Sequence, residues 1–267
     1  MKRGFIFILI IVSLLLVGCN DELMVSATQQ LIINGDCVEG VTDAGRRATE
    51  IVIPDSVKII GEKAFYNCTR ITKITIPSSV EKIENYAFWG CDRLKSITLP
   101  ESIKEIGNGA FTKCIGLESI TIPKGVTVIS RYLFQECESL TEVNIHNNVT
   151  SIFDSAFFSC TSLKTINIPN SVTTIGDRIF VNCQSLQYIK IPEGVTELGE
   201  ECFYDCGSLS YVVIPSTVTK IGEYSFELCG KLKDIYINQN NANILNNTHY
   251  PKKGCKIHTN STGPRSL

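Results

Sequence analysis

Hydrophobic and polar positions repeat along most of the chain with one fixed period, the interval that separates Phe65 from Phe88. In each repeat, two apolar residues alternate with polar ones directly before a proline, as Ile51 and Ile53 do before Pro54. Alternation with period two predicts a β-strand with one buried face, and proline ends such a strand because it lacks the N–H group that a ladder needs. The apolar pair recurs as far as 235 and 237, so we expect a stack of parallel strands.

The apolar spacing changes after the proline of each repeat. In the first repeat, Val57 and Ile60 are the two inward anchors of a predicted tight turn. Ala64, Cys68 and Ile71 follow at i, i+4 and i+7, which predicts a short helical turn packed inward. Each repeat should therefore contribute one strand, one tight turn and one helical turn.

Phenylalanine and cysteine mark the repeat most regularly. A fixed period of this length is typical of a solenoid, in which each unit buries its apolar face on its neighbours. Strands stacked at ~4.8 Å would make nine such coils roughly 40 Å long. The phenylalanines are Phe65, Phe88, Phe111, Phe134, Phe157, Phe180, Phe203 and Phe226, and the cysteines three positions later are Cys68, Cys91, Cys114, Cys137, Cys160, Cys183, Cys206 and Cys229.

The complete unit reads Ile-x-Ile-Pro-x-x-Val-x-x-Ile-Gly-x-x-Ala-Phe-x-x-Cys-x-x-Leu-x-x, and it resembles the BspA-like class of leucine-rich repeat proteins. This resemblance implies an α/β repeat solenoid, a right-handed leucine-rich-repeat-like superhelix. Its parallel β-strand ladder would line the concave face, with turns and helical turns on the convex face. Proteins of this class are typically exported or surface-attached bacterial proteins, and several are adhesins that bind host matrix proteins or other cells.

Four departures from the repeat lie close together in the middle of the chain. Ser130 and Phe153 replace the glycine, Leu133 replaces the alanine, and His146 replaces the proline. These substitutions predict either a local change in curvature or sequence drift without structural effect.

The N-terminus differs in character from the repeats. Lys2 and Arg3 precede an apolar run over 5–17 that is too short for a comfortable membrane span but suits a signal peptide. The run ends in Leu16-Val17-Gly18-Cys19, which resembles the lipobox of bacterial lipoproteins and implies lipidation of Cys19. An ordinary secretory signal, with Cys19 incidental, is the alternative. We expect an exported protein that is lipid-anchored to the bacterial envelope, at the outer membrane or cell surface.

The domain organisation follows from these patterns. Alternation near the start of the repeats and a turn at Gly35-Asp36 predict a capping strand or hairpin, and Cys255-Lys256-Ile257 suggests a closing strand. The predicted parts are a signal peptide over 1–18, a lipid-anchored tether over 19–28, an N-terminal cap over 29–49, the leucine-rich repeat solenoid over 50–237, and a C-terminal cap and tail over 238–267.

Composition and charge exclude one class of binding partner. Of the 267 residues, 43% are hydrophobic and 19% charged, which is ordinary for a globular protein. Removal of residues 1–18 would leave 23 basic and 27 acidic residues, and no basic cluster lies along the repeats. We therefore expect no nucleic-acid partner, because a phosphate-tracking groove needs clustered positive charge.

The repeat cysteines raise the question of metals and disulfides. Zinc sites need converging ligands at short spacings, so cysteines a whole repeat apart without histidine partners predict no metal. Stacked Cβ atoms lie too far apart for easy disulfide formation, which predicts a ladder of buried, reduced thiols that includes Cys202. A serine at Cys137 would then bury a hydroxyl without an assured partner. Cys37 and Cys255 belong to opposite caps and cannot reach each other.

Catalytic residues and cofactor motifs do not stand out. His249 and His258 fall in the polar tail, and His146 has no placed acid or nucleophile beside it. No nucleophile elbow, phosphate loop or dinucleotide fingerprint occurs in the sequence, so we expect neither an enzyme nor a cofactor.

The outward-facing strand positions become aromatic toward the C-terminal end. Tyr188 and Tyr211 should stack on adjacent strands, with Lys190, Val213 and Tyr236 beside them. Exposed tyrosines on a rigid face are typical of binding surfaces, because they are large, amphipathic and lose little entropy when ordered. Cross-strand pairing that only stabilises the sheet, at ~0.2–1 kcal/mol per pair, explains them equally well. The candidate ligand-binding residues are Tyr188, Lys190, Tyr211 and Tyr236.

The sequence as a whole predicts a non-catalytic, adhesin-like surface protein that recognises host matrix or cell-surface proteins through its concave face. One alternative is a carbohydrate-binding surface lipoprotein whose tyrosines stack on sugar rings. Another is a structural scaffold without a soluble ligand. Sugar binding should tolerate salt, whereas charge-steered protein binding should weaken as salt rises.

Overall fold

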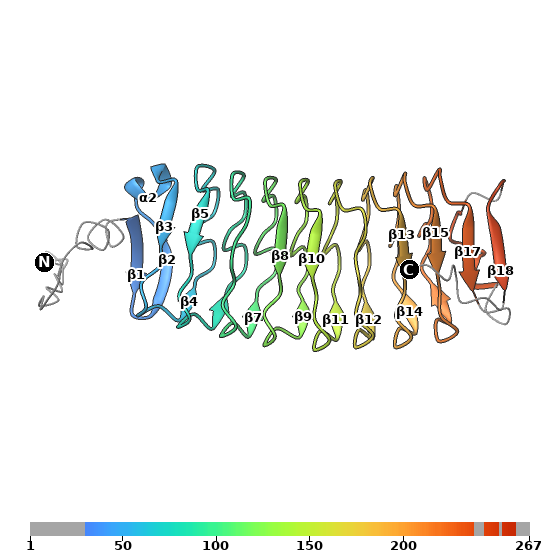
Figure 1. Cartoon of the computed structure of the whole chain (residues 1–267), viewed down its shortest axis with the longest axis horizontal. Helices are drawn as coiled ribbons and strands as arrows, with labels where there is room; N and C mark the ends of the chain where they lie inside the picture. The colour runs from blue at the N-terminus through green and yellow to red at the C-terminus, as the bar shows by residue number, and fades with distance from the viewer. Residues whose placement is uncertain (1–29, 238–242, 251–252, 260–267) are drawn as a thin grey trace, which may run out of the picture.

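A computed structural model describes residues 30–237, 243–250 and 253–259. The predicted signal peptide, the predicted lipidation site at Cys19 and the predicted tether lie outside the described residues. Coils stack side by side along the long axis of the molecule, from an N-terminal hairpin at one end to β17 and β18 at the other (Figure 1). Among the described residues, no helix has the length and apolar character that a membrane crossing requires.

A hairpin covers the N-terminal end of the stack. Strands β1 (Leu31–Asn34) and β2 (Cys37–Val41) pair antiparallel, and Gly35 at the turn has a φ of 61° that favours glycine. The short helix α2 (Asp43–Arg47) follows directly. Because β2 also pairs in parallel with the first coil, the hairpin shields an edge that would otherwise be open to another chain.

The predicted parallel ladder is present. Its three-residue strands have an outward, a buried and an outward residue in turn, as the alternation before the proline indicated, except that Val213 is buried. Neighbouring strands pair one repeat apart, so Glu50 lies opposite Lys73 and Tyr188 opposite Tyr211. The strands of this first row are β3 (Glu50–Val52), β5 (Lys73–Thr75), β8 (Ser119–Thr121), β10 (Glu142–Asn144), β13 (Tyr188–Lys190), β15 (Tyr211–Val213), β17 (Asp234–Ile237) and β18 (Lys256–Thr259).

A second row of parallel strands lies where the sequence predicted only a tight turn (Figure 1). These strands are two residues long, and each has one buried apolar residue, such as Ile60 or Ile83. They are β4 (Ile59–Ile60), β6 (Lys82–Ile83), β7 (Glu105–Ile106), β9 (Val128–Ile129), β11 (Ser151–Ile152), β12 (Thr174–Ile175), β14 (Glu197–Leu198) and β16 (Lys220–Ile221).

The prediction of helical turns is wrong, because no residue between 50 and 237 is helical. The N–H groups of Lys63, Phe65 and Asn67 donate to carbonyl groups of the next coil, over 2.6–3.0 Å. The intervening N–H groups, such as that of Ala64, donate three residues back within their own coil. Positive φ angles of 57° at Lys63 and 56° at Asn67 also prevent a continuous helix. The solenoid is therefore built of strands and turns rather than being α/β.

The core is one continuous column of aromatic rings and thiols. All eight repeat phenylalanines are fully buried, and Phe65 stacks on Phe88 with ring centroids 5.2 Å apart and planes 1° from parallel. The repeat cysteines beside them are also fully buried. Burial of the thiols agrees with the sequence, whereas their reduced state stays a prediction.

The thiols have a hydrogen-bond partner that the sequence did not reveal. Cys137 Sγ donates to the carbonyl oxygen of Phe111 in the preceding coil, over 3.1 Å. The same bond recurs from Cys91 to Cys229, at distances of 3.0–3.4 Å. The expectation that a serine at Cys137 would lack an assured partner is therefore wrong, since its hydroxyl would face the same carbonyl.

The irregular repeats in the middle of the chain keep their place in the stack. Ser130 donates its hydroxyl hydrogen to the carbonyl of Ile106 in the preceding coil. His146 bridges with both ring nitrogens: Nε2 lies 2.8 Å from the carbonyl of Pro123, and Nδ1 accepts from the N–H of Asn148 over 3.1 Å. Local bonds between coils thus replace the lost glycine and proline, and the aromatic column continues through the segment.

Candidate ligand-binding face

Three tyrosines lie together on the outward face of the first strand row. Strands β13, β15 and β17 carry Tyr188, Tyr211 and Tyr236 in parallel register. The rings of Tyr188 and Tyr211 stack with centroids 5.3 Å apart and planes 4° from parallel, as predicted. Tyr236 meets Tyr211 edge to face at 6.2 Å. All three side chains are half-buried, and burial together with the neighbouring phenols raises the pKa of Tyr211.

Two residues of this cluster were not predicted. His258 on β18 stacks on Tyr236 with centroids 4.6 Å apart, and its Nε2 lies 2.7 Å from Oδ1 of Asp234. From the sequence alone, His258 was expected to lie in a polar tail. The available signal was the alternation of Lys256–Thr259, which continues the hint of a closing strand at Cys255-Lys256-Ile257.

The two remaining predicted neighbours differ in exposure. Lys190 is exposed and lies in register with Val213 on the next strand. Val213 was expected to face outward, but only 6% of it is accessible. In register it lies between Lys190 and Tyr236 on the two neighbouring strands. The structure therefore brings Tyr188, Lys190, Tyr211 and Tyr236 together over an apolar base.

A hollow of about 360 Å³ lies beside Tyr188. It lies between coil 6 (residues 165–187) and coil 7 (residues 188–210). Residues 165–167 of coil 6 form no strand, so β13 has a hydrogen-bonded neighbour on its β15 side only. The hollow is lined by Thr165, Ile166, Asn167, Ile168, Asn170, Tyr188, Lys190 and Pro192.

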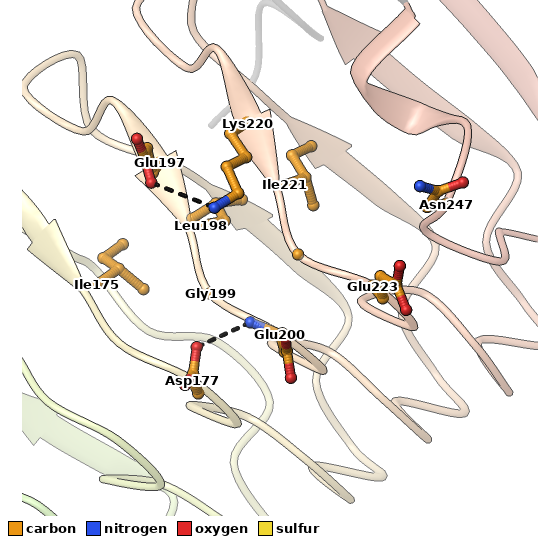
Figure 2. Close-up of a pocket in the computed structure, with 11 residues that line it drawn as sticks. Ile175, Asp177, Glu197, Leu198, Gly199, Glu200, Lys220, Ile221, Glu223 and Asn247 are labelled. Carbon is orange, nitrogen blue, oxygen red and sulfur yellow. Dashed lines mark hydrogen bonds and ion pairs between the residues drawn. The ribbon is translucent and has the colours of Figure 1, made fainter.

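A larger hollow of about 560 Å³ lies on the second strand row (Figure 2). It is rich in carboxylates, but Glu197 pairs with Lys220 over 3.8 Å and Asp177 accepts from the N–H of Glu200 over 2.9 Å. Across the described part of the chain, no three or more histidine, cysteine or carboxylate side chains are grouped to hold a metal ion. This hollow has neither an aromatic side chain nor a metal-ligand group, so it is the weaker candidate for a ligand site.

The repeats match a known family model. The model describes a BspA type leucine rich repeat region of six copies, and it matches residues 44–164 and 151–260. The chain belongs to the BspA-type leucine-rich repeat family. The resemblance inferred from the repeat unit is therefore confirmed. No curated protein matches the chain of this BspA-type protein.

Solved structures of leucine-rich repeat proteins resemble the BspA-type solenoid. A leucine rich cell surface protein of Faecalibacterium prausnitzii A2-165 is 27% identical, with 82% of this chain and 80% of that chain covered and a TM-score of 0.49. The pneumococcal vaccine antigen PcpA is 21% identical, with 79% and 62% covered and a TM-score of 0.55. A leucine rich repeat protein of T. pallidum is 23% identical, with 74% and 72% covered and a TM-score of 0.42. The likeness to PcpA supports the solenoid fold.

Proposed function

We propose that this BspA-type protein is a non-catalytic, surface-attached binding protein. Its ligand-binding face is formed by Tyr188, Lys190, Tyr211 and Tyr236, and it recognises proteins of a host matrix or of another cell. The observation that carries this proposal is the cluster of three half-buried tyrosines on successive strands of one rigid ladder.

Rigid aromatic side chains suit this role for a thermodynamic reason. Association is opposed by the entropy of every side chain that must be ordered. The stacked rings of Tyr188 and Tyr211 are already ordered by each other, so little entropy remains to be lost on binding. Lys190 beside them adds a charge that steers an acidic partner without being buried.

Attachment at the surface rests on the sequence and the family. The lipobox-like run that ends at Cys19 supports export and lipidation, and BspA-type proteins are typically exported or surface-attached. A lipid on Cys19 would hold the solenoid close to the envelope, leaving its strand face open to ligands outside the cell.

Two matched double variants of the full-length protein test the binding face. Tyr188→Ala with Tyr211→Ala should weaken binding to a matrix-protein ligand at least tenfold, or about 1.4 kcal/mol. The control is Thr98→Ala with Thr121→Ala, at outward positions of the same strand row in coils 3 and 4. Affinities are measured by surface plasmon resonance after a screen of purified matrix proteins and glycans. Equal losses in both double variants would contradict a defined site, and no loss in the tyrosine pair would place the site elsewhere.

A further inference from the structure

The aromatic stack on the strand face ends at the hollow between coils 6 and 7. Tyr211 covers one face of the Tyr188 ring. On the other side, the equivalent position one repeat earlier is Thr165, which is too small to continue the stack. Tyr188 and Thr165 both line the hollow, so the second ring face of Tyr188 borders a space of about 360 Å³. That space lies at the lower end of the range for small-molecule sites.

Polar side chains without protein partners surround this ring face. Thr165, Asn167 and Asn170 are exposed, and within the described chain their side chains form no hydrogen bond. The neighbouring coil behaves differently, because Asn144 donates its amide to Glu142 and to Thr121, over 3.0 and 3.4 Å. The polar groups at the hollow are therefore free for a ligand with several hydroxyl groups.

The charge at the hollow has one sign. Lys190 is the single charged residue of its lining, and it forms no ion pair with any described residue. Lysines on other coils do form such pairs, for example Lys104 with Glu81 at 2.7 Å. An unpaired ammonium beside uncharged donors and acceptors favours a ligand that carries one negative group.

We propose that this hollow binds a pyranose ring with a carboxylate substituent, as in a uronic acid. The C–H face of the sugar stacks on the free face of Tyr188, whose π-electrons attract the slightly positive C–H groups. The carboxylate pairs with Lys190, and the hydroxyl groups bond to Asn167, Asn170 and Thr165. This inference rests on the proposed function, because it assigns to the same face a site for an acidic sugar carried by the ligand.

The probes are methyl β-D-glucuronide and methyl β-D-glucoside. They differ only at C6, which is a carboxylate in the glucuronide and a hydroxymethyl group in the glucoside. Saturation-transfer NMR on the full-length protein should show binding of both, with the glucuronide at least threefold tighter at low salt. Tyr188→Ala should abolish both signals. Lys190→Gln should make the two affinities equal, because it removes the charge and leaves the ring face intact. Tyr66→Ala is the control, since Tyr66 is a comparably exposed tyrosine that stacks on Trp89 far from the hollow.

Thr165→Tyr tests the site without removing a stabilising contact. The new ring would continue the column of Tyr188 and Tyr211 into the hollow and occupy the place of the sugar. The protein should remain folded, as judged by its thermal unfolding, and should lose both glycosides. Persistent binding in Thr165→Tyr or in Tyr188→Ala would overturn the inference, and so would failure of the parent protein to bind either glycoside. If the glycosides fail to bind but the Tyr188/Tyr211 double variant still binds its matrix-protein ligand more weakly than the parent does, the proposed function stands without the sugar site.

Discussion

The repeat cysteine fills a small space and donates a weak hydrogen bond from the same atom. In coil 6, Cys183 Sγ lies 3.2 Å from the carbonyl oxygen of Phe157, which also accepts the N–H of Cys160 over 3.2 Å. One carbonyl thus joins two coils, and the thiol is the group that crosses between them. Burial raises the pKa of Cys183 to about 12, because the thiolate would be desolvated in the core.

This raised pKa predicts that the protein loses stability in alkali. Below the pKa of an exposed thiol, near 9, Cys183 is protonated in both states and its contribution to stability is complete. As the pH rises from about 9 to 12, the unfolded state loses this proton while the folded state keeps it, so the free energy of unfolding falls. Each such thiol should contribute a slope of about −1.4 kcal/mol per pH unit.

Urea unfolding under reducing conditions at several pH values between 8 and 11 measures this slope. Cys183→Ser keeps a donor for Phe157 and removes one titrating thiol, so its slope should be shallower by about 1.4 kcal/mol per pH unit. Identical slopes for the parent and the variant would show that this thiol titrates alike in the folded and unfolded states.

At the scale of elements, left-handed backbone conformations explain why the segment that follows the second-row strand in each coil is a series of turns. Two places in each such segment have a left-handed φ, and residues that tolerate it, such as Asn67, Gly90 and Asn182, often occupy the second place. In coil 8 the same place holds Leu228, with a φ of 60° and 57% of its surface exposed. Leucine gains neither burial nor a favourable conformation there.

Leu228→Asn should therefore raise the free energy of unfolding, by about 0.5–1 kcal/mol, because asparagine adopts this backbone conformation at lower cost. Chemical denaturation of the two proteins measures the difference. Glu227→Asn is the matched control, since its φ is not positive and its change should stay within about 0.5 kcal/mol. A Leu228→Asn protein no more stable than its parent would mean that the surrounding turn bonds already offset the strain.

Ion pairs between adjacent coils favour the native register of the stack. The side chains of Arg178 and Glu201 are one repeat apart and meet on adjacent coils through two bonds of 3.1 and 3.2 Å. Lys82 with Glu105 and Lys95 with Glu118 follow the same spacing. Such exposed pairs stabilise little by themselves. Their common spacing instead favours the native register over a slipped one.

At the scale of the whole molecule, the two strand rows are interrupted at different places. The first row lacks strand pairing between β5 and β8 and between β10 and β13, and the second row lacks it between β7 and β9 and between β12 and β14. The core column bridges these gaps, since consecutive repeat phenylalanines stack with ring centroids 5.2–6.0 Å apart. Surface hollows at the gaps therefore form without breaking the solenoid.

The position of the whole molecule relative to the cell depends on Cys19 in our proposal. Cys19→Ala should abolish labelling by a palmitate analogue and release the protein from the membrane fraction. Both are measured in cells by in-gel fluorescence and by fractionation. The control is Cys37→Ala, which leaves the lipobox-like run intact and should be labelled normally. Labelling of Cys19→Ala at the parent's level would remove the lipoprotein proposal.

The sequence by itself determined every feature that depends on the fixed period. Residues one period apart become lateral neighbours when coils stack, so the buried Phe65 column and the pairing of Tyr188 with Tyr211 follow directly from counting. Burial of the thiols follows in the same way, because a small apolar group at a fixed place in each coil must face the core.

Only the tertiary structure decided where hydrogen bonds go and where the period fails. The spacing of Ala64, Cys68 and Ile71 suits a helix, but alternate N–H groups of their segment donate to carbonyl groups of the next coil. The sequence of one repeat does not show that these acceptors are within reach. His258 reaches Tyr236 because β18 rejoins the ladder just short of a full period after β17. The hollow beside Tyr188 likewise depends on a missing strand pair that the regular sequence of coil 6 does not indicate. In these features, hydrogen bonds within one coil compete with hydrogen bonds to the adjacent coil. The outcome depends on how the coils stack, so it cannot be predicted from a single repeat.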